Sequence, residues 1–231
     1  MTHINHVLAS LDPQVSGELL CAGRRIEFGL GDAVIQPRQS APEVFFPTSG
    51  LVTISVAIEN EHVATAMASH SDVVGSEGIF GDYQRFTSVL GQIPGTGYLV
   101  SIKIVADAAN RDLRFKTLVD REQIFMLAQA QQTAACNARH SARQRVASWI
   151  LRIIAALNSN RFCMTQFDLA HMIGIERATV SVAAGWLADL KAIKYKRGRI
   201  EVLSAELLAH YACECHSRLA ENRRRLFGYA K

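Results

Sequence analysis

Apolar residues follow two different periods along the chain, and the change falls near residue 105. In residues 26–104, short apolar runs alternate with turn residues at spacings of about 8–12 residues, as strands do in all-β folds. This spacing predicts a β-sandwich or barrel. Residues 3–25 instead show the three- and four-residue spacing of one or two short helices.

Beyond residue 105 the pattern is helical. Proline is absent there, and in residues 118–157 apolar and alanine side chains recur at three- and four-residue steps. A narrow, alanine-rich stripe is typical of a helix that packs closely on another helix. We therefore predict a packing or dimer helix over residues 113–138, a break near 137–141, a further helix over 143–157 and a terminal helix over 204–231. The predicted dimer contacts are Ile124, Leu127, Ala128, Gln131 and Ala135.

Residues 164–202 have the pattern of a winged helix-turn-helix. Thr165 can cap a helix, with Asp168 completing a capping box, and Gly174 can end that helix in the left-handed conformation. A second helix should begin near Glu176. The residues expected to face inward on it are Val180, Ala183, Ala184 and Leu187.

The polar positions of this segment favour DNA binding over an ordinary helical hairpin. Arg177, Thr179 and Ser181 lie on or beside the outer face of the second helix, near its N-terminus, where side chains reach phosphates and base edges. Ile193 and Tyr195 then alternate with lysines up to a basic turn at residues 196–199, and the alternation resumes afterwards. This hairpin is the predicted wing.

Charge is divided unevenly between the two halves. The 231 residues carry a net charge of +4, with 49% hydrophobic and 20% charged residues, as in a globular protein. Residues 1–112 hold six Lys and Arg against twelve Asp and Glu, whereas residues 113–231 hold nineteen against nine. A cationic half joined to an anionic half indicates a nucleic-acid reader attached to a separate sensing or scaffolding domain.

Several classes of protein are not indicated. No run of 18 apolar residues occurs, and the N-terminus lacks the cationic start and apolar core of a secretory signal, so we expect a cytoplasmic protein with no membrane partner. The sequence contains no paired carboxylate site and no H-E-x-x-H, G-x-S-x-G or phosphate-cradling glycine motif. We therefore expect no enzymatic activity.

The five cysteines are Cys21, Cys136, Cys163, Cys213 and Cys215. Their odd number and wide scatter predict free thiols and no ready set for an iron–sulfur cluster. Only Cys213 and Cys215, with the adjoining His216, suggest a metal site. If both sulfurs project from one helix they diverge by about 200°, so we predict that no metal binds there.

In this order, the predicted elements resemble the Crp/Fnr family of bacterial transcription regulators. The resemblance is sharpest at residues 165–170, 174, 177–181 and 197–200, with support from residues 46–50 and 145–151. It implies an α+β fold with an N-terminal, jelly-roll-like β-roll sensor domain (1–112), a long dimerisation helix (113–138) and a C-terminal winged helix-turn-helix domain (139–231).

The resemblance also implies a homodimer that reads a palindromic operator in double-stranded DNA, with RNA polymerase as a further candidate partner. Arg177 would read a guanine, whereas Thr165 and Gln166 would hold the DNA backbone. Family members often carry arginine where this chain has Val182, so the operator is expected to differ. The full set of implied DNA contacts is Thr165, Gln166, Glu176, Arg177, Thr179, Ser181, Lys196, Arg197 and Arg199. Glu176 could accept a hydrogen bond from cytosine or simply cap its helix.

The sensory half departs further from the family. Cyclic-nucleotide members grip ribose and phosphate with a Gly-Glu pair and a later Arg-Ser or Arg-Thr. In an ungapped alignment, Ser76 and Phe86 replace the glutamate and the arginine, and Arg85 should point to the opposite face of a strand. These differences argue against a cyclic nucleotide. The positions that correspond to the effector pocket are Gly75, Ser76, Glu77, Arg85 and Thr87.

The effector itself stays open. The N-terminal cysteine cluster of the oxygen-sensing branch is absent, whereas heme could find ligands among His3, His6, His62 and His70. The competing functional hypothesis is an effector-binding β-roll whose winged domain contacts proteins instead of DNA. The basic wing favours DNA.

Overall fold

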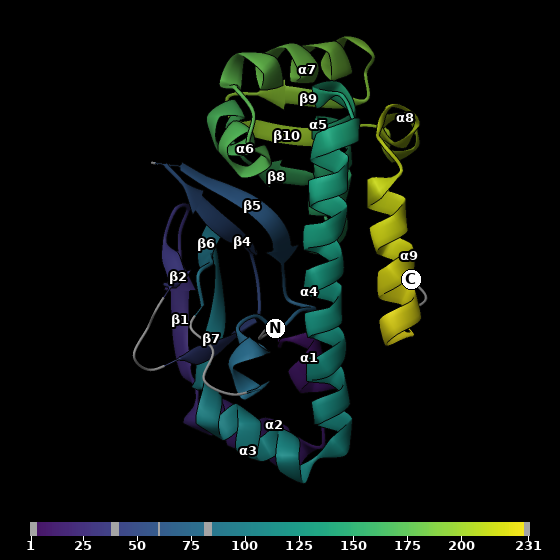
Figure 1. Ribbon diagram of the computed structural model, residues 1–231. Helices are drawn as coiled ribbons and strands as arrows, with labels where there is room; N and C mark the ends of the chain where they lie inside the picture. The colour runs from purple at the N-terminus through teal and green to yellow at the C-terminus, as the bar shows by residue number, and fades with distance from the viewer. Residues whose placement is uncertain (1–3, 38–41, 60, 81–84, 229–231) are drawn as a thin grey trace. The chain divides into compact units, whose positions relative to one another are not determined.

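The computed structural model describes residues 4–37, 42–59, 61–80 and 85–228. Contacts divide the chain into two compact units. Residues up to 55 together with 67–127 form the first unit, and residues 56–66 together with those from 128 onward form the second. Figure 1 shows both and labels most of their helices and strands.

The first unit is a β-roll flanked by helices. Its sheets have the strand orders β1-β7-β3 and β2-β6-β4-β5, although the end of β4 and most of β5 fall within residues 56–66 of the second unit. The strand-rich pattern predicted from the sequence is confirmed, and the N-terminal stretch forms two short helices. The strands are β1 (Arg24–Phe28), β2 (Ala33–Ile35), β3 (Glu43–Pro47), β4 (Leu51–Ile58), β5 (Glu61–Ala68), β6 (Ser88–Ile93) and β7 (Gly95–Ser101). The helices that accompany them are α1 (His6–Ala9), α2 (Pro13–Ala22), the 3₁₀ helix η1 (Ser76–Phe80) and α3 (Ile102–Arg111).

Strand β3 shows how alternation builds the core of this unit. Phe45 faces a cluster made by both sheets, in which it meets Phe28 edge to face with ring centroids 5.8 Å apart. Phe46, one residue later, points to the other side and joins a cluster with Leu19 of α2 and Val105 of α3. Strand β3 is therefore buried on both faces, with residues of the second sheet on one side and helices on the other.

Helix α4 (Leu113–Arg139) is 27 residues long and contributes residues to both units, and α5 (Ala142–Leu157) follows it. The break predicted near residues 137–141 is confirmed. Ser141 starts α5 with a capping box. Its Oγ accepts a hydrogen bond from the backbone N–H of Gln144, and its own backbone N–H donates to the side chain of Gln144.

The second unit contains a three-helix core and a small sheet. Its elements are β8 (Arg161–Cys163), α6 (Gln166–Ile173), α7 (Arg177–Asp189), β9 (Ile193–Lys196), β10 (Arg199–Val202), α8 (Ala205–Tyr211) and α9 (Cys215–Phe227). The sheet order is β8-β10-β9, with antiparallel pairing throughout. Ile150 of α5, Leu169 of α6 and Leu187 of α7 are fully buried between the packed helices.

The C-terminal region corrects one prediction. The sequence pattern indicated a single terminal helix over residues 204–231, but α8 and α9 are separate, and Ala212 between them has an extended backbone (φ −78°, ψ 158°). No glycine or proline marks this break. Cys213 and Cys215 are buried on either side of the turn, so tertiary packing outweighs local helix propensity here.

None of the helices in the described residues has the length and apolar character needed to cross a membrane.

Candidate nucleic-acid interface

Helix α6 is fixed at both ends by the residues that the sequence singled out. The Oγ1 of Thr165 accepts a hydrogen bond from the backbone N–H of Asp168 (3.1 Å), and the Asp168 carboxylate accepts one from the backbone N–H of Thr165 (2.9 Å). Gly174 ends the helix in the left-handed conformation (φ 69°, ψ 51°), which glycine adopts without steric cost. The capping box and the turn glycine are therefore both confirmed.

Helix α7 presents a polar face at its N-terminus. Arg177 is its first residue and is exposed, Ser181 one turn later is exposed, and Thr179 is half-buried. The predicted inward residues of this helix are all buried. Glu176 occupies the N-cap position, but its side chain makes no capping hydrogen bond. Its carboxylate is exposed beside Arg177, so side-chain capping does not explain this residue.

The wing is a tight basic hairpin. Lys196 and Arg199 face each other across β9 and β10, while Arg197 (φ 49°) and Gly198 (φ 72°) both adopt left-handed backbone conformations. Two such residues in succession are the signature of a type I′ turn. A hollow of about 490 Å³ on the wing is lined by Lys194, Lys196, Arg197, Arg199 and Glu201. Four cations around one carboxylate attract polyanions.

Two contacts hold the wing against the start of α6. The backbone N–H of Met164 donates to the carbonyl of Gly198 (2.8 Å), and the hydroxyl of Tyr195 donates to the carbonyl of Met164 (3.1 Å). Burial, followed by the nearby Asp168 carboxylate, raises the pKa of Tyr195 to about 12, so the phenol keeps its proton at neutral pH. In the sequence pattern Tyr195 counts only as an apolar wing position, so this role was not predicted.

Arg145 of α5 is a second positioning residue that the sequence did not reveal. Its guanidinium is buried, and one Nη donates to the carbonyl of Ile173 at the end of α6 (2.8 Å). Burial lowers the pKa of Arg145. The contact links α5 to the turn between α6 and α7, so it helps to set the angle at which α7 leaves that turn.

One expectation for the effector residues is wrong. Arg85 does not point away from the cassette on a strand: it precedes β6, is 8% exposed, and forms an ion pair with Glu77 (2.8 Å). The exposed residue is Phe86, at 67%. The direction of the Arg85 side chain was predicted wrongly because the ungapped alignment placed it on a strand with strict alternation. The backbone is irregular at Arg85, so side-chain direction there does not follow a period of two.

The other effector positions lie around this pair. Gly75 has φ +100°, and an added Cβ would meet the Glu43 carbonyl at 2.7 Å. Ser76 is buried, and its hydroxyl accepts a hydrogen bond from Gln123 of α4 (3.2 Å). Thr87 is half-buried. The structure thus brings these residues together around a cation whose charge Glu77 already balances.

Two of the histidines considered as heme ligands pack against each other. His6 and His70 stack edge to face with ring centroids 4.5 Å apart, and the ring of His6 also lies 3.1 Å from the Ser71 hydroxyl. His62 is exposed on β5. His3 lies outside the described residues.

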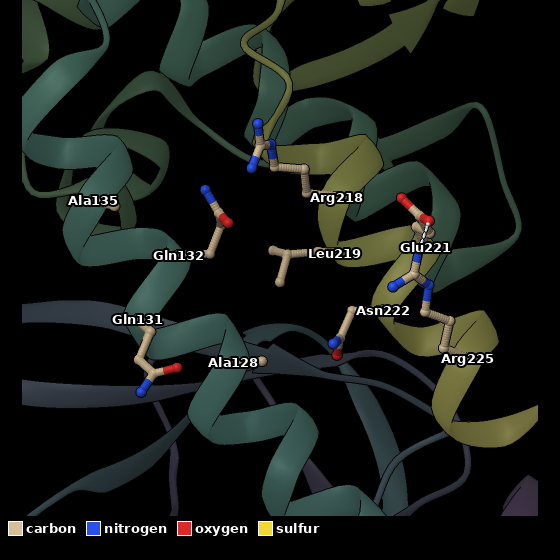
Figure 2. A pocket seen from close by; sticks show the side chains of 9 residues that line it. All are labelled: Ala128, Gln131, Gln132, Ala135, Arg218, Leu219, Glu221, Asn222 and Arg225. Atoms are coloured by element: carbon tan, nitrogen blue, oxygen red, sulfur yellow. Dashed lines mark hydrogen bonds and ion pairs between the residues drawn. The ribbon is translucent and has the colours of Figure 1, made fainter.

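Most of the predicted dimer stripe of α4 is exposed. Ile124 and Leu127 are 54% and 59% exposed, respectively, large values for aliphatic side chains. Gln131 and Ala135 are also exposed, and Ala128 is half-buried. Farther along, α4 and α9 flank a groove of about 360 Å³ (Figure 2). Its lining consists of Ala128, Gln131, Gln132 and Ala135 from α4 and Arg218, Leu219, Glu221, Asn222 and Arg225 from α9.

Comparisons with known proteins match this geometry. Residues 144–211 match the family model of the Crp-like helix-turn-helix domain. No curated protein sequence matches the chain.

Solved structures share the fold over most of the chain. FixK2 from Bradyrhizobium japonicum aligns with a TM-score of 0.71 at 16% identity, covering 83% of this chain and 98% of its own. A CooA variant from Carboxydothermus hydrogenoformans aligns with a TM-score of 0.67 at 15% identity, covering 92% and 96%. The c-di-GMP responsive regulator CLP of Xanthomonas campestris aligns with a TM-score of 0.66 at 14% identity, covering 84% and 100%.

At these identities the structural likeness establishes the fold, and the helix-turn-helix match adds the domain family. The chain therefore combines a β-roll and a long helix with a Crp-like helix-turn-helix domain, in the fold of the Crp/Fnr-type transcription regulators.

Proposed function

We propose that this chain is a homodimeric, sequence-specific DNA-binding transcription regulator with no catalytic role of its own. The observation that carries the proposal is the exposed guanidinium of Arg177 at the N-terminus of α7, next to a wing lined by four cations. Arginine at the start of a recognition helix can donate two hydrogen bonds to guanine in the major groove. Double-stranded DNA is the proposed partner, with RNA polymerase as a second.

The remaining contacts divide between bases and phosphates. Thr179 and Ser181 follow Arg177 on α7 and can reach bases or phosphate. Thr165 and Gln166 begin α6, where the positive end of the helix dipole favours phosphate. Lys196, Arg197 and Arg199 would follow the DNA backbone from the wing, and Glu176 could accept a hydrogen bond from cytosine.

The domain plan of the proposal has three parts. Residues 1–112 are the sensor domain, residues 113–138 the dimerisation helix, and residues 139–231 the DNA-binding domain. Pairing two chains through the exposed stripe of α4 would place two recognition helices about 34 Å apart, one turn of DNA. A palindromic operator with half-sites at that spacing is the expected target.

The wing makes a testable contribution to affinity. Each phosphate contact releases a counterion, so operator affinity should fall steeply with salt. Removing two contacts from each chain of the dimer removes four per operator, which should reduce the slope of log K against log salt by about 4. We expect this for the double substitution Lys196→Ala and Arg199→Ala, measured by fluorescence anisotropy across a salt series. Glu201→Gln, on the same wing, should instead leave the slope unchanged or steeper. A slope that does not respond to the double substitution would place the phosphate contacts elsewhere.

The proposed effector is a molecule other than cyclic AMP. Glu77 pairs with one Nη of Arg85, so a cyclic phosphate on this cation would either displace the carboxylate, at a cost of about 1.5–3 kcal/mol for a charge-assisted pair, or lie beside its negative charge. Ser76 stands where cyclic-nucleotide members carry glutamate, and Gln123 already holds its hydroxyl. Both observations support a different ligand.

Cyclic AMP should therefore leave the thermal unfolding midpoint unchanged. A ligand at a hundred times its Kd adds about 2.7 kcal/mol of stability, which would raise Tm by several degrees in a chain of this size. Differential scanning calorimetry with millimolar cyclic AMP measures this directly. A rise in Tm that disappears in Arg85→Ala would overturn this part of the proposal without touching DNA recognition.

A further inference from the structure

Four metal-ligating side chains from distant parts of the sequence meet in the second unit. Cys136 lies near the end of α4, His140 lies between α4 and α5, Cys213 lies in the turn before α9, and Cys215 is the first residue of α9. Their ligand atoms all lie within 4.8 Å of one another. The three cysteines are at most 5% exposed, and His140 is half-buried.

The prediction that no metal binds here rested on a helix geometry that the structure does not have. It assumed that Cys213 and Cys215 share one helix, which would send their sulfurs in different directions. Cys213 instead precedes α9, after the extended residue Ala212. The turn lets both sulfurs approach the same point.

We propose that Cys136, His140, Cys213 and Cys215 form a closed tetrahedral site for a single Zn²⁺ ion. Three thiolates and one imidazole are a common ligand set of structural zinc sites. Each thiol would release its proton to solvent when the ion binds, and the imidazole would bind in its neutral form.

The distances fit one ion. Zinc bonds of about 2.3 Å to sulfur and about 2.0–2.1 Å to nitrogen, at tetrahedral angles, separate two sulfurs by about 3.8 Å and a sulfur from a nitrogen by about 3.6 Å. The Sγ atoms of Cys136 and Cys213 are 3.6 Å apart, and the Sγ of Cys215 is 3.5 Å from the Nδ1 of His140. A cluster of several irons would need its ligand sulfurs farther apart, so the compact set favours a single ion.

The groups around the four ligands also match a metal site. His140 directs Nδ1 towards the cluster and Nε2 towards the carboxylate of Glu214, 3.4 Å away. A carboxylate on the second ring nitrogen is the usual way in which proteins orient a zinc-bound histidine. The side-chain amide of Gln132 donates to the Sγ of Cys215 (3.1 Å), as expected for a stabilised thiolate.

Charge balance supports the same assignment. Three thiolates around Zn²⁺ leave one net negative charge in a buried place, which needs nearby cations. The guanidinium groups of Arg145 and Arg152 are close enough to interact electrostatically with these cysteines. Arg152 is held in place by the Gln129 side chain, 2.8 Å from its Nη2.

The site would join three segments at one point. It would pin the start of α9 to the end of α4, at the residue where the chain turns into α5. This inference goes beyond the proposed function, and its tests involve no DNA.

The test is metal binding by the full chain. Protein stripped with a chelator under reducing conditions should take up one Zn²⁺ per chain. Co²⁺ in its place should give thiolate-to-cobalt charge-transfer bands and the intense visible bands of tetrahedral coordination. Cys136→Ser and Cys213→Ser should each weaken binding by more than about tenfold, whereas Cys163→Ser, at an exposed cysteine of the same unit, should bind as the unmodified chain does.

A gentler variant keeps the test informative if the cysteine variants do not fold. Glu214→Gln removes only the second-layer carboxylate at a largely exposed side chain and should weaken metal binding by about 10–100-fold. Lack of stoichiometric binding by the unmodified chain would overturn the proposal. The proposal would also fail if the isolated chain carried a Cys136–Cys213 disulfide, seen as a mass lower by two hydrogens, and if the reduced chain then gave no tetrahedral cobalt spectrum.

Discussion

Arg177→Ala is expected to cost about 1–3 kcal/mol of binding free energy at each half-site, a loss of roughly 5- to 150-fold there, and to relax base preference at one position in each half-site. The guanidinium is exposed on the first residue of α7, so its removal leaves the buried face of the helix intact. In a symmetric dimer the loss occurs twice per operator. Selection from a randomised operator library, followed by affinity measurement, gives both quantities.

Two further variants separate base reading from charge. Arg177→Lys keeps the positive charge but lacks the planar fork, so it should lose base preference while the salt dependence stays the same. Arg218→Ala removes the same charge from an exposed site on α9 and should leave base preference unaltered. If Arg177→Ala kept its full preference for every base pair, Arg177 would not be the reader. If the unmodified chain showed no preference for any DNA, the winged domain would instead serve protein contacts.

Leu127→Glu is expected to convert the proposed dimer into monomers and to remove high-affinity operator binding with it. Leu127 is 59% exposed on α4, beside Ile124 in the predicted stripe. A two-fold interface would bury both copies, so losing two leucines costs about 3–6 kcal/mol before the added carboxylates repel each other. The dissociation constant of the dimer should therefore rise by on the order of 10²–10⁴-fold, which sedimentation equilibrium can measure.

Leu203→Glu is the matched control for this prediction. Leu203 is 52% exposed just after β10, outside the predicted stripe, and its backbone bond to the Ala192 carbonyl does not involve the side chain. This variant should remain dimeric at the concentrations where Leu127→Glu is monomeric. A dimer that survives Leu127→Glu would show that the chains associate through another surface.

The helix-turn-helix was predictable because its signals are local. The Thr165–Asp168 capping box spans four residues, Gly174 is the single residue whose left-handed backbone ends α6, and the wing turn is formed by two neighbouring residues. Hydrogen bonds that close over three or four positions leave a direct trace in the order of residue types. The exposed stripe of α4 is local in the same sense, because one helix supplies all of it.

Interactions between distant residues were not predictable in this way. Tyr195 bonds to Met164 across 31 positions, and Arg145 bonds to Ile173 across 28. Neither pair has a characteristic spacing. Arg85 was misplaced for a related reason, since the direction of its side chain depends on an ion pair with Glu77 and on an irregular backbone that alternation does not describe.

By itself the sequence determined the periodicity of each half, the caps and turns of the reader, and the separation of charge. These follow from backbone geometry over a few residues and from composition. The tertiary structure alone decided where α8 ends and that Cys136 and Cys213, 77 residues apart, come within 3.6 Å. Such an encounter depends on how packed helices bring distant positions together, and the spacing of residues along a chain carries no record of it.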